Sequence, residues 1–202
     1  MLLDFTEIDS RQAYQWMVSM IAPRPIAWVS TMSGEGVVNL APFSFFNGIT
    51  SRPPTIMFVP VTKFDGTPKD TLRNIEETEE FVINLVSADL AEAMNATAAA
   101  LPYGESEFAR FGIESVASER VAPPRVATAR VALECKLHQI VRMGDEPGVA
   151  NVVFGRILTA HVSDTVLGID GRIDPRRLDL IGRMGGDDYC TTRDQFTVER
   201  PD

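Results

Sequence analysis

Two long runs of strand-forming residues late in the chain constrain the fold most. They cover about 129–142 and 150–162, and both are rich in β-branched and other apolar residues. A short link, Gly144–Gly148, joins them. A link of this length suits antiparallel neighbours, because parallel strands need a much longer crossover. The sequence therefore predicts a long antiparallel hairpin within a mainly antiparallel sheet.

The rest of the chain adds shorter strands and a few helices in uneven order. Strands are expected at 26–32, 37–43, 55–61 and 81–86, the first two forming a hairpin around Ser33–Gly36. Helices are expected at about 10–21, capped by Asp9 or Ser10, at 72–77, capped by Asp70 or Thr71, and at about 89–100. Pro60 places the third strand at an edge or a bulge. This order is unlike a doubly wound fold, and a small closed barrel would remove the sheet edges.

Length and composition predict one domain. A chain of 202 residues with 45% hydrophobic residues can bury a substantial core, and it contains no repeat or linker segment. We expect a single domain over 1–202, with a barrel core at about 23–165 and a C-terminal extension at about 166–202.

Charge and terminal sequence exclude several classes of partner. The formal net charge is −9, from 28 acidic and 19 basic residues, so neither a nucleic-acid partner nor a membrane surface is expected. The first residues lack the basic and apolar regions of a signal peptide, and no stretch is apolar and long enough to span a bilayer. Cys135 and Cys190 make no disulfide framework. A cytoplasmic protein is the expectation.

Familiar catalytic motifs are missing. The sequence has no glycine-rich dinucleotide loop, no phosphate loop and no serine-hydrolase elbow. Its two histidines, His138 and His161, have no nearby cysteine or histidine, which argues against zinc. Cys135 has no identifiable catalytic partner. An enzyme of this kind would use a cofactor for its chemistry.

The segment Asn39–Pro54 has the composition of a binding site. It combines short polar side chains, flat apolar ones and one cation: Ser44, Asn47, Thr50, Ser51, Phe43, Phe45, Phe46 and Arg52. The surrounding window from Arg24 to Arg73 carries a net charge of +2, from five cations and three anions. A flat, polar-edged, anionic ligand needs such a mixture. The alternative is a proline-containing connection between strands, with the phenylalanines in the core.

Several linked motifs resemble the flavin reductase-like family, which includes flavoredoxin-type proteins. They follow in the family's order and spacing: Pro23–Thr31, Asn39–Gly48, Ser51–Pro54, Lys69–Asn74 and Phe81–Asn84, with a C-terminal signature at Arg183–Tyr189. The resemblance implies an FMN-binding split β-barrel, Greek-key-like and homodimeric, with flavin near the subunit interface. It also implies reduction of the flavin by NADH or NADPH.

The resemblance and the chemistry of the side chains together select the cofactor-binding candidates. These are Ser30, Thr31, Ser44, Phe46, Asn47, Thr50, Ser51, Arg52, Lys69, Thr71 and Asn84. Hydroxyls and amides can contact phosphate, ribityl or ring-edge atoms, and Lys69 at a helix start suits a phosphate, with Asp70 as the cap. Asn84 is either such a contact or a satisfied buried amide. Trp28 is expected in the core.

Three functional interpretations remain open. The first is an NAD(P)H-dependent FMN reductase that works by positioning the two rings, without a catalytic side chain, and supplies an acceptor or a partner oxygenase. Arg183 and Tyr189 would then lie on the nicotinamide side or at a dimer contact. The second is an FMN-holding electron carrier that uses no nicotinamide, because the chain reads Gly144-Asp145-Glu146 where many of these reductases have Gly-Asp-His. The third is a split-barrel binding protein for another ligand.

Overall fold

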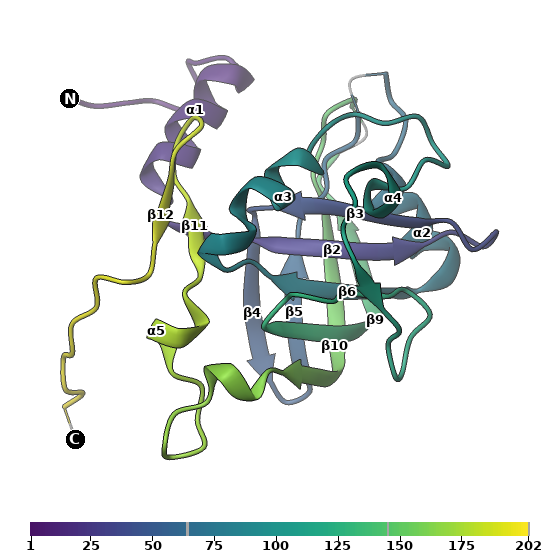
Figure 1. Ribbon diagram of the computed structural model, residues 1–202. Helices are drawn as coiled ribbons and strands as arrows, with labels where there is room; N and C mark the ends of the chain where they lie inside the picture. The colour runs from purple at the N-terminus through teal and green to yellow at the C-terminus, as the bar shows by residue number, and fades with distance from the viewer. Residues whose placement is uncertain (64, 145, 202) are drawn as a thin grey trace.

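A seven-stranded antiparallel sheet forms the centre of the computed structural model, which describes residues 1–63, 65–144 and 146–201 (Figure 1). The strands, in their order across the sheet, are β3 (Val38–Phe43), β2 (Ala27–Met32), β6 (Glu80–Leu85), β9 (Val131–Arg142), β10 (Asn151–Val162), β5 (Pro54–Phe58) and β4 (Phe46–Ser51). The predicted mainly antiparallel fold is confirmed.

The sheet forms a split barrel rather than a closed one. Its outer strands, β3 and β4, follow one another in the chain, and no ladder of hydrogen bonds joins them among the described residues. Pro42 lies within β3 and has no N–H to donate, which suits a strand at an edge. The closed barrel expected from edge avoidance is therefore wrong, and the split form is correct.

The predicted long hairpin is present as β9 and β10. Its register runs from the Arg142–Asn151 pair to the Val131–Val162 pair. The register shifts next to Gly155, where a Cβ atom would lie only 2.2 Å from Cζ of Phe81. Of the connecting segment, Asp145 lies outside the described residues.

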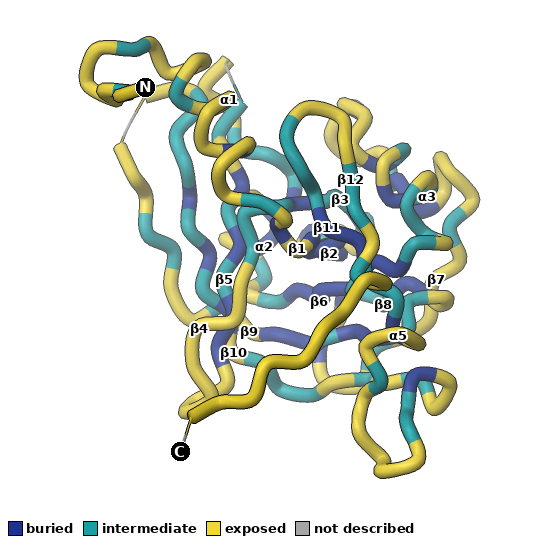
Figure 2. Tube along the Cα trace, turned by 90° about the vertical axis from the view of Figure 1, so that its left-hand side faces the viewer, coloured by how far each residue is buried: buried dark blue, intermediate teal, exposed yellow. Residues whose placement is uncertain are grey.

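Two apolar layers sandwich the central strands, so these strands are buried on both faces (Figure 2). Along β2, Ala27 and Val29 join the interior cluster with Phe43, whereas Trp28 faces a second cluster with Met94. The indole of Trp28 donates to the Thr97 hydroxyl at 2.9 Å. The prediction that Trp28 belongs to the core is confirmed.

The helices in the described part of the chain are short. They are α1 (Ser10–Met20), α2 (Asp70–Thr78), η1 (Ala88–Leu90), α3 (Ala91–Ala96), α4 (Glu107–Arg110), η2 (Asp164–Val166) and α5 (Pro175–Leu178). The Asp9 side chain caps α1 by accepting from the Gln12 N–H at 2.8 Å, as predicted. No described helix has both the length and the apolar character required to cross a bilayer.

Four local expectations need correction. The N-cap of α2 is Lys69, with extended backbone, and Asp70 instead occupies the first turn, where its carboxylate faces the Lys63 ammonium at 3.4 Å. The predicted helix at 89–100 is divided into η1 and α3 and ends earlier. The residues of β4 were assigned to no strand, yet they pair with β5. Of the edge and the bulge expected for the strand before Pro60, the edge is wrong, because β5 ends at Phe58 and lies between β10 and β4; its ladder with β4 does have a register shift, between Gly48 and Thr50.

The other strands of the described residues are only two or three residues long. They are β1 (Arg24–Pro25), β11 (Ile181–Arg183) and β12 (Tyr189–Thr191), which form a three-stranded sheet, and the pair β7 (Ser115–Val116) and β8 (Arg125–Val126).

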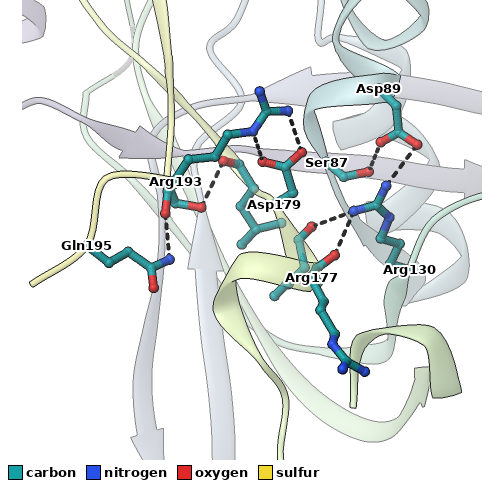
Figure 3. A network of polar contacts seen from close by, with 10 residues as sticks. Ser87, Asp89, Arg130, Arg177, Asp179, Arg193 and Gln195 are labelled. Carbon is teal, nitrogen blue, oxygen red and sulfur yellow. Dashed lines mark hydrogen bonds and ion pairs between the residues drawn. The ribbon is translucent and has the colours of Figure 1, made fainter. Parts of the chain in front are cut away.

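Polar contacts fasten the C-terminal extension to the barrel (Figure 3). Arg130 donates to the Arg177 carbonyl at 2.7 Å and to the Asp89 carboxylate at 3.1 Å. Within the extension itself, Asp179 accepts two hydrogen bonds from Arg193, at 2.8 and 2.7 Å. The extension therefore packs as part of the same domain and carries β11 and β12 back to β1.

Candidate functional site

Three adjoining cavities follow β3 and form the candidate site. The Lys69 cavity, of about 420 Å³, is lined by Asn39, Lys69, Thr71 and Glu107 among others. The Ser44 cavity, of about 220 Å³, shares Pro42 and Ala98 with it. The arginine cavity, of about 490 Å³, shares Tyr14, Ser44 and Arg183 with the Ser44 cavity. Because they share these wall residues, the three cavities lie next to one another, and together they are called the groove; each is of a size that a small ligand or part of one can occupy.

Lys69 places an uncompensated cation at one end of this groove. Its Nζ lies 5.7 Å from the centre of the Phe43 ring, and no carboxylate pairs with it among the described residues. Burial, followed by repulsion from Lys63, lowers the pKa of Lys69 below its ordinary value. The neighbouring N-terminus of α2 adds positive potential. This end of the groove is suited to an anion such as a phosphate.

Thr71 adds a hydroxyl to the same end. The Asn39 amide donates to its oxygen at 3.1 Å, and both side chains are buried. Because that contact uses an acceptor position, the Thr71 hydroxyl keeps its own proton for donation. Asn39 was not among the predicted site residues, although it begins the Asn39–Gly48 motif that contains Ser44.

Glu107 is a second residue that sequence reasoning missed. Its side chain is 5% exposed, and its carboxylate accepts the Leu40 N–H at 2.8 Å. Burial raises the pKa of Glu107, despite the opposing effect of that hydrogen bond. It holds β3 in place from the side of α4, and no motif in the sequence marks it.

Ser44 lies at the middle of the groove, next to the buried Arg24. The Arg24 guanidinium donates to the Ser44 hydroxyl at 3.4 Å and to the carbonyls of Val18, Ile21 and Met184 at 2.5 to 2.8 Å. These carbonyls come from α1, the turn after it and the segment after β11. Burial lowers the pKa of Arg24. In the sequence, the only signal that could have identified Arg24 is its position between Pro23 and Pro25.

Arg183 and Tyr189 lie across the groove from Ser44. The Arg183 guanidinium stacks 4.5 Å from the centre of the Tyr189 ring. The Tyr189 hydroxyl donates to the Asn95 side chain at 3.2 Å. Strands β11 and β12 therefore bring the C-terminal motif to the same groove as the motif around Ser44, which the sequence alone could not place.

Ser30, Thr31 and Asn84 do not reach the three cavities. All three are fully buried and bonded within the protein. The Ser30 hydroxyl donates to the Pro124 carbonyl at 2.5 Å, and the Thr31 hydroxyl accepts from Asn74 at 3.0 Å. Asn84 donates to the backbone of β2 and accepts from that of β8, so it is the satisfied buried amide. Packing on both faces of β2 and β6 explains why these candidates have no surface for a ligand.

The remaining candidates lie on β4 and the turn after it. Phe46 is half-buried, whereas Asn47, Thr50, Ser51 and Arg52 are exposed. None of them lines the three cavities described above. Asn47 accepts from the Gly48 N–H at 2.8 Å, and Thr50 accepts from the Arg52 N–H at 3.1 Å. They form an outward-facing strand that one chain by itself does not bring to the groove.

Comparison with known proteins decides the family. The flavin reductase like domain matches residues 19–173 of this chain. The chain belongs to the flavin reductase-like family. An uncharacterized protein of Halalkalibacterium halodurans is 38% identical over 203 residues, which cover 100% of this chain and 97% of that relative.

Two solved structures extend the family comparison. Nitrilotriacetate monooxygenase component B from Bacillus cereus is similar with a TM-score of 0.92 and 33% identity, covering 98% of both chains. The 2-nitrobenzoate 2-nitroreductase NbaA of Pseudomonas fluorescens has a TM-score of 0.89 and 30% identity, covering 100% of this chain and 96% of that one. Both relationships extend over the C-terminal extension as well as the barrel.

Membership of the flavin reductase-like family implies flavin binding, and the residues of the groove fit a flavin. The uncompensated Lys69 ammonium and the Thr71 hydroxyl suit a phosphate, whereas Pro42 and Ala98 provide apolar wall. Beyond Pro42 and Ala98 the Ser44 cavity adjoins the Lys69 cavity, so a ligand whose phosphate lies at Lys69 has room for a ring beside Ser44.

Proposed function

We propose that this protein is an FMN-dependent oxidoreductase that uses NADH or NADPH and passes electrons to an acceptor or a partner oxygenase. The observation that carries the proposal is the Lys69 cation at one end of the groove, which no carboxylate pairs with among the described residues. The two free cysteines, Cys135 and Cys190, accord with a cytoplasmic setting.

In this proposal the chain acts by binding and positioning. The bound flavin supplies a ring that accepts hydride. Lys69 and Thr71 hold its phosphate by charge and a hydrogen bond, while the Ser44 hydroxyl, polarised by Arg24, bonds to the ring edge. No side chain has to move a proton, because two flat rings held at contact distance suffice for hydride transfer.

We further propose a homodimer in which the residues of β4 complete the flavin site across the subunit interface. Support comes from the apolar side chains exposed on α1, at the residue after it and on β4: Met17, Met20, Ile21 and Ile49. Such side chains favour burial against another protein surface. This would give Phe46, Asn47, Thr50, Ser51 and Arg52 a role that they lack in one chain. Arg183 and Tyr189 would face the nicotinamide or the second subunit.

One observation favours a second candidate, an FMN-holding electron carrier without nicotinamide use. The link between β9 and β10 contains Glu146 and Pro147 and no histidine, unlike many reductases of this family. Both candidates share the same flavin groove and differ only in the source of electrons.

The visible spectrum of the purified protein tests both candidates together. We expect flavin absorption, or saturable FMN uptake by the apoprotein, and a protein that neither carries nor takes up FMN would overturn both. Anaerobic addition of NADH or NADPH then separates them. Bleaching of the flavin supports the reductase, and its absence with both nucleotides supports the carrier. Sedimentation equilibrium measures the proposed dimer directly.

A further inference from the structure

The arginine cavity concentrates positive charge at the opposite end of the groove from Lys69. It lies between α1 and the turn that joins β11 to β12, and its lining includes Arg11, Arg24 and Arg183. Among the described residues that line it, none carries a carboxylate. In a chain with a net charge of −9, three guanidinium groups around one cavity indicate a local site for an anion.

Little in the protein neutralises these charges. Arg24 is 5% exposed and bonds to neutral carbonyl and hydroxyl oxygens. Arg183 donates to the Gly186 carbonyl and faces Asp187 at 3.6 Å, but the Asp187 side chain is fully exposed. Such an exposed pair is weak. Arg11 is exposed and forms no ion pair in the described part of the chain.

The walls beside these charges are flat and aromatic. The Tyr14 ring packs edge-to-face on Phe45, with ring centres 6.5 Å apart and an interplanar angle of 87°. Tyr189 stacks under Arg183 and lines the adjoining Ser44 cavity. The guanidinium group binds a carboxylate through two parallel hydrogen bonds and also stacks on rings. A ligand that satisfies both features has a planar ring and a carboxylate.

We propose that the arginine cavity binds a small aromatic carboxylate. Its carboxylate pairs with Arg183 and Arg11, and its ring lies against Tyr14. The site is separate from the Lys69 cavity, to which the proposed function assigns the flavin phosphate. Because Ser44 and Arg183 line both the arginine cavity and the Ser44 cavity, the ligand lies beside the proposed position of the flavin ring and competes there with any nicotinamide that faces Arg183. Binding does not require flavin, so this site stands or falls separately from the proposed function.

Calorimetric titration of the flavin-free full-length protein with benzoate tests the site. We expect saturable binding, and benzamide, which has the same ring without the charge, to bind at least about tenfold more weakly. Arg183→Gln and Arg11→Gln should each weaken benzoate binding by about tenfold. Arg11 is an exposed residue of α1, so its variant keeps the test valid should Arg183→Gln fail to fold.

Arg172→Gln is the matched control, because Arg172 is 88% exposed and lies outside the cavity. It should leave benzoate binding unchanged. Equal binding of benzoate and benzamide, or an affinity for benzoate that ignores both arginine substitutions, overturns the proposal. The proposal is also overturned if binding of inorganic phosphate depends on Arg183 while binding of benzoate does not depend on it. FMN titration of the same samples reports on the proposed function: benzoate binding without FMN uptake leaves this site intact and rejects the flavin assignment.

Discussion

Replacing Lys69 by Met removes the charge that we assign to the flavin phosphate while keeping most of the apolar stem. In the structure Lys69 has no carboxylate partner among the described residues, and its ammonium lies over Phe43 in a half-buried position. A phosphate bound there would be its main counter-charge. The substitution should therefore weaken FMN binding without breaking an internal ion pair.

The expected size follows from the kind of interaction that the substitution removes. A hydrogen bond to a charged group contributes about 1.5–3 kcal/mol, which corresponds to a decrease in affinity of about 10- to 100-fold. The pKa of Lys69 is lowered by burial and by Lys63, and its charged form binds the phosphate. FMN affinity of the native protein should thus fall as the pH rises through that lowered pKa, below the range of an ordinary lysine.

Fluorescence quenching of FMN by the apoprotein, measured between about pH 7 and about pH 10, provides the assay, since free lysine titrates near pH 10.4. Lys63→Met is the matched control: Lys63 lines the same cavity but already pairs with Asp70 at 3.4 Å. It should change FMN affinity only a few-fold, and Lys69→Met should remove the alkaline decrease in affinity. Unchanged affinity in Lys69→Met, or the same alkaline decrease in that variant, would refute the assignment of the phosphate to this lysine.

Three further predictions concern the barrel and the groove. Gly155→Ala should lower the free energy of unfolding by about 1–3 kcal/mol in urea titrations, because its Cβ would lie 2.2 Å from Phe81, and Phe81→Leu should recover part of that loss. Asn39→Ala should weaken FMN binding without abolishing it, because Thr71 loses the donor that orients its hydroxyl; an unchanged dissociation constant would contradict this. Burial opposes ionisation of Glu134, but hydrogen bonds from the backbone and from His161 outweigh burial and lower the pKa of Glu134. The contribution of ionised Glu134 to the stability of the folded protein should therefore be complete above the unfolded-state pKa. It should be lost as the pH falls through the lower pKa of the folded state. Glu134→Gln should cost about 1–3 kcal/mol at pH 7 and make the acid transition shallower, and an equally steep transition in the variant would count against this role.

Local sequence patterns predicted much of the fold because local rules govern those elements. The Asp9 cap, the hairpin of β2 and β3 and the long β9–β10 hairpin depend on capping, turns and strand-forming runs close in sequence. Strand β4 was missed because its exposed residues have no apolar alternation, and its pairing with β5 is what makes it a strand. The cap of α2 shifted to Lys69 because Asp70 pairs with Lys63 instead.

The site was only partly predictable for a similar reason. Lys69, Thr71, Ser44, Arg183 and Tyr189 carry polar groups that the motifs identify, and the structure brings them to one groove. The hydroxyl or amide chemistry of a side chain, however, does not reveal whether other parts of the protein already use it. Ser30, Thr31 and Asn84 have suitable groups, but distant segments satisfy them.

The sequence by itself determined the antiparallel class, the family and the anionic character of the expected ligand, because strand pattern, motif spacing and charge are local properties of the chain. Tertiary structure alone decided which cations remain uncompensated. Lys63 is paired and Lys69 is not, and Arg24 is buried among carbonyls while Arg183 faces a cavity, within the part of the chain that the structure describes. These differences depend on contacts between residues far apart in the chain, which burial and electrostatics select only once the barrel has formed.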